Sequence, residues 1–150
     1  MKLLLTFSAL ILTACSTPPA PDESTYGASV GIVNHTGNFI YSASVNGAGG
    51  ANMSRWGAGI ADVCCATVPS KWYPGTQVHV QWDMPEGSNH SYKAKYVAVE
   101  RYDEPGSVYL HFFPNDQVRV VVSRAGGTSP MHPIPAPIRP APQPNPTKFD

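Results

Sequence analysis

The sequence predicts an all-β protein, folded as a single compact antiparallel β-sandwich or open barrel of about seven strands. Three observations support this fold class. Apolar and polar residues alternate with period two through residues 26–124, turn residues separate the alternating segments, and no stretch of ten or more residues has the 3.6-residue period of a helix. The chain has 150 residues, enough for one domain of ordinary size. Only 13% of them are charged, which leaves few of the Lys and Glu residues that exposed helices use.

The first half of the domain gives three predicted strands. Residues 29–34 (SVGIVN) and 39–46 (FIYSASVN) alternate in polarity and flank a turn at residues 35–38, whose glycine can adopt a positive φ. Residues 47–59 contain five glycines, and we expect them to form a loop. Residues 61–68 (ADVCCATV) are predicted to form a strand that stops at the proline that follows it.

The second half gives four more predicted strands after a Pro74-Gly75 turn. These strands cover residues 77–83, 92–101, 107–113 and 117–123, and polar turns separate them. The strand at 77–83 has the clearest alternation, because every second residue from the valine at its second position is apolar and the others are polar. This pattern is typical of a strand with one buried and one solvated face.

The first fourteen residues form a predicted signal peptide. A lysine precedes an apolar segment of about ten residues, half of the roughly twenty that a membrane-spanning helix needs. Leu12-Thr13-Ala14-Cys15 follows and resembles the lipobox of bacterial lipoproteins. The resemblance implies cleavage before Cys15, lipidation of Cys15 and attachment to a membrane. By analogy with lipoprotein sorting, Ser16 favours the periplasmic face of the outer membrane of a Gram-negative bacterium over the inner membrane. The alternative interpretation of residues 1–15 is an ordinary secretory signal with an incidental cysteine.

Two segments outside the predicted domain are rich in proline. Residues 15–25 hold the lipidated cysteine and a tether with three prolines. Residues 125–150 contain eight prolines, a density that excludes helices and sheet ladders. We expect this tail to be solvated and disordered. The alternatives are a strap that lies along the domain and a ligand for a partner.

Two adjacent cysteines, Cys64 and Cys65, are the thiols that remain once Cys15 carries lipid. Three arrangements are open for them in an oxidising compartment: a vicinal disulfide, two buried free thiols, or pairing between molecules. A metal site is not expected, because no CxxC motif or nearby histidine has the usual ligand spacing. Thioredoxin-like chemistry is not expected either, since it uses CxxC before a helix.

The motifs of catalysis are not found in the sequence. The chain has five histidines: His35, His79, His90, His111 and His132. They form no HxH or HExxH motif, and there is no GxSxG elbow or phosphate-binding loop. His79 and Asp83 share a strand face that we expect to be solvated, and His111 alternates with apolar residues and is expected to face outward. No cofactor, catalytic residue or enzyme activity is predicted, and a formal net charge of zero argues against nucleic-acid binding through bulk positive charge.

Four residues in or beside predicted loops are candidates for binding a protein partner: Arg55, Trp56, Trp72 and Tyr73. Trp, Tyr and Arg are the residues that interfaces favour. The alternative for Trp72 and Tyr73 is that they pack under the Pro-Gly turn as lids of the core.

Several segments together carry a family resemblance. In order, they are Val33 to Gly37 (VNHTG), Ile40, Val45-Asn46-Gly47 with the glycines after it, Val63-Cys64-Cys65, Pro69, Trp72, Pro74-Gly75 and Val80-x-Trp82. Over about residues 30–83 they resemble a bacterial lipoprotein family of uncharacterised domains whose members are commonly encoded beside type VI secretion genes, including phospholipase effectors. The resemblance implies a periplasmic immunity protein that binds and neutralises such a lipase. The alternatives are a structural or assembly lipoprotein of the cell envelope, and an enzyme or redox protein that uses Cys64 and Cys65.

Overall fold

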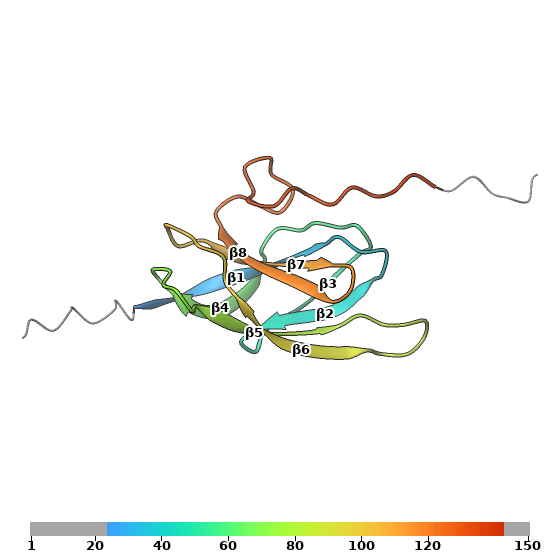
Figure 1. Ribbon diagram of the computed structural model, residues 1–150, viewed down its shortest axis with the longest axis horizontal. Coiled ribbons are helices and arrows are strands. Elements are labelled where there is room, and N and C mark those ends of the chain that lie inside the picture. Colours follow the sequence, from blue (N-terminus) through green and yellow to red (C-terminus); the bar gives the residue numbers. More distant parts are fainter. Residues whose placement is uncertain (1–23, 143–150) are drawn as a thin grey trace, which may run out of the picture.

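Two four-stranded sheets pack face to face in the computed structural model of the chain, which describes residues 24–142 (Figure 1). The eight strands are β1 (Thr25–Asn34), β2 (Ile40–Val45), β3 (Ala48–Met53), β4 (Val63–Pro69), β5 (Gln77–Asp83), β6 (Tyr92–Ala98), β7 (Ser107–Phe113) and β8 (Gln117–Ser123). The described residues contain no helix, and the all-β sandwich prediction is confirmed. Accordingly, no helix among residues 24–142 is long and apolar enough to cross a membrane. The predicted signal peptide, Cys15 and most of the tether lie outside the described residues.

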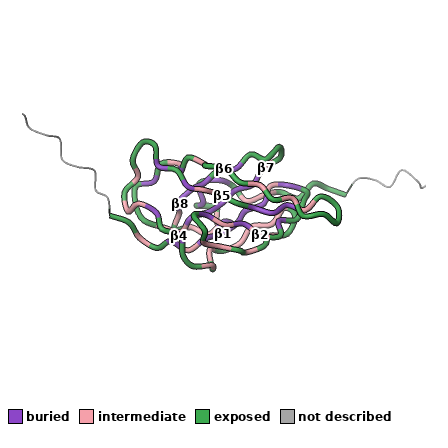
Figure 2. The backbone as a smooth tube through the Cα atoms, turned by 90° about the horizontal axis from the view of Figure 1, so that it is seen from below, coloured by how far each residue is buried: buried purple, intermediate pink, exposed green. Residues whose placement is uncertain are grey.

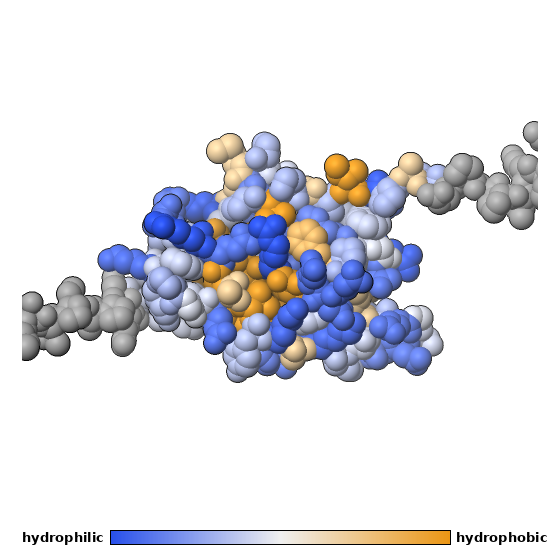
Figure 3. Space-filling view, viewed as in Figure 1, coloured by the Kyte–Doolittle hydropathy of each residue, from blue (hydrophilic) through white to orange (hydrophobic). Residues whose placement is uncertain are grey.

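The strand order is β4-β1-β7-β8 in one sheet and β3-β2-β5-β6 in the other. All pairs are antiparallel except β1 and β7, which are parallel. Aliphatic side chains from both sheets fill the space between them, and its fully buried members include Ile32, Ile40, Val45, Val80, Val108 and Leu110. Burial is highest along the strands and lowest in the connecting loops (Figure 2). Where the edge strands β8 and β6 face each other, apolar residues are visible between hydrophilic ones (Figure 3).

The alternation predicted for β5 is confirmed, because Val78, Val80 and Trp82 are all buried in the core. The prediction of a loop at residues 47–59 is wrong for its first half, which forms β3. Asn46 and Gly47 both have positive φ, at 50° and 79°, and make the two-residue hairpin turn that joins β2 to β3. An Asn-Gly pair is a strong hairpin signal. The glycines that follow this pair favoured the prediction of a loop instead.

The outer face of the sheet β4-β1-β7-β8 is covered by a third layer, and we call it the covered face. Its covers are the loop between β3 and β4 (residues 54–62, the covering loop) and the chain after β8 (residues 125–134, the strap). Both lie on the same side of the sandwich in Figure 1. Beneath them is a second apolar cluster of four buried side chains: Val33, Tyr109, Val121 and Ile134.

The strap corrects the predicted domain boundary at residue 124. Ile134 is only 5% exposed and packs in the second cluster, so the prediction of a solvated tail is wrong for residues 125–134 and the strap alternative describes them. The strap also explains an error about His111. This residue lies on the face of β7 opposite Leu110 and Phe112, as predicted, but it is fully buried because the strap covers that face.

Candidate functional site

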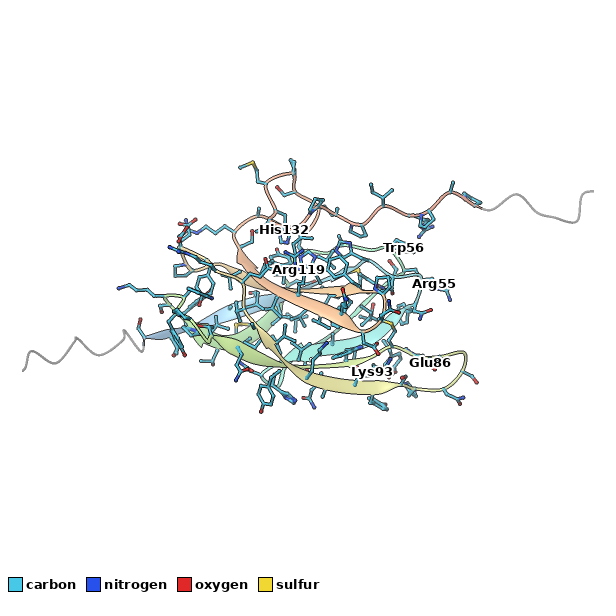
Figure 4. All side chains as sticks on the ribbon, in the orientation of Figure 1. Arg55, Trp56, Glu86, Lys93, Arg119 and His132 are labelled. Carbon is cyan, nitrogen blue, oxygen red and sulfur yellow. A yellow bond between two sulfur atoms is a disulfide. The ribbon has the colours of Figure 1, made fainter. Side chains whose placement is uncertain are left out.

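One end of the sandwich brings together two of the four predicted partner-binding residues. Arg55 and Trp56 lie there in the covering loop, and Glu86 and Lys93 lie at the same end below them (Figure 4). This end, which we call the loop end, consists of residues 35–39, 54–57, 84–91 and 114–116. It is the candidate binding site.

A buried asparagine fixes the loops at this end. Asn34, which is fully buried, donates from Nδ2 to the carbonyl oxygens of Asn38 (2.7 Å) and Ser54 (3.1 Å). Its Oδ1 accepts from the backbone N–H of Thr36 (3.0 Å) and from the Thr36 hydroxyl (2.8 Å). One side chain thus ties the turn after β1 to the start of the covering loop. Since both polar atoms of its side chain are hydrogen-bonded, these bonds offset the desolvation of the buried Asn34 and hold the two segments rigidly.

Trp56 is held in an uncommon backbone conformation. Its φ is 55°, in the left-handed region that bulky residues rarely adopt. The Trp56 N–H donates to the Thr36 carbonyl oxygen at 3.1 Å, and the indole ring lies against Gly37, where an added Cβ would be 3.6 Å from the ring. Trp56 is half-buried, and the neighbouring Arg55 is exposed and forms no ion pair among residues 24–142. A strained residue on a rigid support is typical of a functional site.

A groove of about 250 Å³ lies beside Gly37, the residue against which the indole packs. It runs between Thr36, the β5–β6 connection and the β7–β8 turn, with Phe113 in its wall. Its charged rim is a small ion-pair group in which Lys93 Nζ lies 2.8 Å from Asp116 Oδ1 and 3.9 Å from Glu86 Oε1. These groups are exposed or half-buried, so they add little stability and are available to steer a charged partner.

Three histidines connect the loop end to the strap. His35 Nε2 is 3.0 Å from His111 Nδ1, and His111 Nε2 is 2.9 Å from His132 Nε2. The other nitrogen of His132, Nδ1, is 2.8 Å from the Ala125 carbonyl oxygen and must carry a proton, because a carbonyl can only accept. In the neutral state this fixes the direction of every bond: His35 donates to His111, which donates to His132.

The electrostatics of this histidine chain favour the neutral state. Burial, reinforced by His132, His35 and Arg119, lowers the pKa of His111 to about 3. Burial and Arg119 also lower the pKa of His35. The Arg119 guanidinium keeps its own charge in a two-bond pair with Glu100, with Nε 2.6 Å from Oε1. A proton on His111 would place two N–H groups face to face and break the chain.

The other two predicted binding residues lie at the opposite end of the sandwich, in the β4–β5 connection. Trp72 is half-buried against the core and donates from Nε1 to the Val99 carbonyl oxygen at 2.8 Å. Tyr73 is 44% exposed beside it. The four candidates therefore lie at two opposite ends of the sandwich, and for Trp72 the lid alternative describes the structure.

The vicinal cysteines form a disulfide across a cis peptide bond in the edge strand β4. Both are exposed, which excludes the alternative of two buried thiols. The register with β1 shifts here, so that Cys64 and Cys65 together oppose Ser29. This two-against-one count is a β-bulge, a device that bends an edge strand.

The outer face of β5 also differs from the sequence prediction. His79 and Asp83 do share this face, but Asp83 is fully buried and not solvated. Its carboxylate accepts from the Ser91 backbone N–H at 2.9 Å and hydrogen-bonds to His90 Nδ1. The sequence pattern did not indicate His90 as a partner of Asp83, because His90 lies outside the alternating segment, in the connection after β5. Among residues 24–142, no group of three or more His, Cys, Asp or Glu side chains is placed to hold a metal ion.

Residues 33–120 match a known protein family, whose description is "Protein of unknown function (DUF3304)". The matched segment begins at Val33, beside the Asn34 network, and ends in β8, so it includes the loop end and most of both sheets. No curated protein and no solved structure matches the chain. Because the match covers more than half of its 150 residues, the chain belongs to the DUF3304 family.

Proposed function

We propose that this protein is a lipid-anchored binding module of the periplasm, and that it acts as an immunity protein that neutralises a type VI secreted phospholipase effector. In this proposal the loop end is the interface and the protein acts by binding, without catalysis of its own. Cys15 carries the lipid that keeps it at the outer membrane, near the surface that a phospholipase attacks.

The observation that carries the proposal is the way Trp56 is presented. A tryptophan with positive φ, next to an exposed arginine and on a hydrogen-bonded support, loses little conformational freedom when it binds. Trp and Arg dominate the hot spots of protein interfaces. The adjoining 250 Å³ groove gives a partner's side chain a place to enter. Together these features suit a projecting loop that blocks the mouth of an enzyme's active site.

The proposal expects the neighbouring gene to encode a phospholipase effector, and the test is inhibition of that gene's product. We expect the wild-type chain to abolish phospholipase activity at nearly equimolar ratio, and to rescue cells that direct the enzyme to their periplasm. Trp56→Ala should raise the Kd at least about 30-fold, the effect of removing a strong hot spot. Tyr73→Ala is the matched control, since it removes an exposed aromatic from the other end of the sandwich and should leave inhibition unchanged.

Anchoring has a separate test. Cys15→Ala should abolish incorporation of labelled palmitate and reduce protection of cells, while leaving inhibition in solution intact. The proposal fails if the wild-type chain neither binds nor inhibits the enzyme. If Tyr73→Ala and Trp56→Ala weaken inhibition equally, binding occurs but the assigned interface is wrong.

A further inference from the structure

The outer face of the sheet β3-β2-β5-β6, which we call the open face, carries exposed aromatic side chains. Tyr41 is 55% exposed, Tyr92 75% and Tyr96 70%, and no segment among residues 24–142 covers them. Exposed aromatic side chains that gather on one face, in contrast to scattered single ones, are typical of binding surfaces. Tyr92 and Tyr96 lie on the same side of β6, four residues and therefore roughly 13 Å apart along the strand.

Each end of this face has a tyrosine supported by a histidine. At one end the rings of Tyr92 and His90 stack at 5.6 Å, and Tyr41 meets the other side of His90 edge-on at 5.0 Å. The buried Asp83 holds His90 Nδ1, which turns Nε2 away from Asp83. At the other end Tyr96 packs against His79 at 4.9 Å. The rings are thus held in place before any ligand arrives.

Small and polar side chains form the floor between the two ends. A cavity of about 320 Å³ opens there, and its lining includes Ser42, Ser44, Gly50, Gln81, Tyr92 and Ala94. This size is at the low end of ligand-binding pockets. The serine hydroxyls and the Gln81 amide offer hydrogen-bond donors and acceptors without charge.

The charges near the cavity are already compensated. Lys93 also lines it, but its ammonium group lies 2.8 Å and 3.0 Å from the two carboxylate oxygens of Asp116. The carboxylate of Asp83 is buried and hydrogen-bonded to His90 and to Ser91. Among the described residues that line the cavity, no cation is left unpaired for an anionic ligand, and an acyl chain would leave the serine and glutamine groups without partners.

We propose that the open face is a binding site for a neutral glycan chain. A sugar ring has apolar C–H faces that stack on aromatic rings, and hydroxyl groups at its edges that suit serine and glutamine side chains. Tyr92 and Tyr96 would each stack on a sugar ring, and the chain between those rings would lie over Ala94 and Gln81. The site adjoins the loop end, with which it shares His90 and Lys93, but it does not depend on the proposed function.

The test is titration of the full chain, in a detergent without a sugar head group, with a soluble β-1,4-linked tetramer of N-acetylglucosamine. Calorimetry should show saturable binding, and amide NMR shifts should concentrate in β2, β5 and β6. Tyr92→Ala and Tyr96→Ala should each raise the Kd at least about tenfold, which corresponds to about 1.4 kcal/mol, because each substitution removes one of the two rings on which a sugar would stack. Tyr73→Ala, an exposed tyrosine away from this face, should leave the Kd unchanged.

Three results would overturn the proposal. The first is no binding of the tetramer at millimolar concentration by a wild-type chain that is shown to be folded. The second is binding that the Tyr92→Ala, Tyr96→Ala double variant retains. The third is loss of phospholipase inhibition in this double variant without any sugar binding by the wild type, which would make the open face a protein interface. Trp56→Ala separates the two proposals, because this variant should retain sugar binding whether or not Trp56 is needed for phospholipase inhibition.

Discussion

The covered face and the open face are the outer sides of two similar four-stranded sheets, yet their aromatic residues differ in exposure. Tyr109 on the covered face is 3% exposed, whereas Tyr92 and Tyr96 on the open face are 75% and 70% exposed. The strands beneath do not cause this difference, since β6 and β7 both alternate and both pair along their length. The covering loop and the strap cause it, because they lie on one face only.

Residues on a covered sheet face must pack closely against the covering segments, and their buried polar groups need hydrogen-bond partners within the protein. Gly31 in β1 allows the ring of Tyr109 to lie across the strand, because a Cβ there would meet that ring at 2.5 Å. His111 and His132 are buried polar residues, and each of their ring nitrogens has a hydrogen-bond partner. On the open face Ser42, Ser44 and Gln81 are half-buried or exposed and keep water as a partner, while the buried Asp83 is hydrogen-bonded to His90 and Ser91. Substitutions on the covered face should therefore lower the free energy of unfolding. Substitutions on the open face should instead weaken the binding of a ligand.

Within the strap, the largest effect on stability is expected at Ile134, which packs the strap against the sheet. Ile134→Ala should lower the free energy of unfolding by about 2–4 kcal/mol, because it removes a 5% exposed side chain from the second cluster. Ile138→Ala is the control: its side chain is 87% exposed, and the change should be below about 0.5 kcal/mol. Urea unfolding measures both. Equal effects of the two substitutions would show that the strap does not cover the sheet in solution.

The second expected effect is a loss of stability in acid that originates in the histidine chain. The pKa of His111 is about 3 in the folded protein and near 6.5 in the unfolded chain, so between these values the unfolded chain binds the additional proton. Stability therefore falls as pH decreases from about 6.5 toward 3, by up to about 1.4 kcal/mol per pH unit. The lowered pKa of His35 acts in the same direction. Urea unfolding at a series of pH values measures the slope.

A pair of histidine variants isolates this contribution. His111→Gln removes the group whose pKa is about 3 and should reduce the slope below pH 6.5, although it also lowers stability at neutral pH. His79→Gln, on the open face, should leave the slope as it is in the wild type. A slope that persists in His111→Gln would assign the acid sensitivity to other groups.

A smaller effect is expected where the covering loop is anchored. Thr36→Val removes the hydroxyl that lies 2.8 Å from Asn34 Oδ1 and should cost about 1–2 kcal/mol. Because Trp56 donates to the Thr36 carbonyl, its N–H should also exchange faster with solvent. Thr67→Val, an exposed threonine in β4, is the control and should change neither quantity. Unchanged exchange at Trp56 in Thr36→Val would mean that the hydroxyl does not hold the loop.

Strand positions were predictable from local pattern, because alternation is a property of neighbouring residues. The pattern placed β5, β7 and β8 within the bounds that the structure shows. It also predicted that the His111 side chain lies on the face of β7 opposite Leu110 and Phe112. It could not give the burial of His111, which depends on a strap more than ten residues downstream in the chain. The strap itself has no regular period, and its prolines favoured a solvated tail.

The candidate site was predictable only in part, for the same reason. Arg55 and Trp56 were found from residue type and loop position alone. Their support by Asn34, their separation from Trp72 and the groove beside them depend on contacts between distant segments. The aromatic group on the open face was missed because Tyr41, His90 and Tyr96 come from different elements. One local signal was present: Tyr92 and Tyr96 stand at positions of the same parity in one strand.

The smallest effect on stability is expected on the open face. Tyr92→Ala and Tyr96→Ala should each change the free energy of unfolding by less than about 0.5 kcal/mol, since their rings are largely exposed already. The corresponding change on the covered face, Tyr109→Ala, should cost about 3–5 kcal/mol because it empties the second cluster. Urea unfolding of the three variants compares the faces directly. A cost above about 1 kcal/mol at Tyr92 or Tyr96 would mean that these rings are covered in solution, by a second copy or by residues outside 24–142, and that the open face is not open.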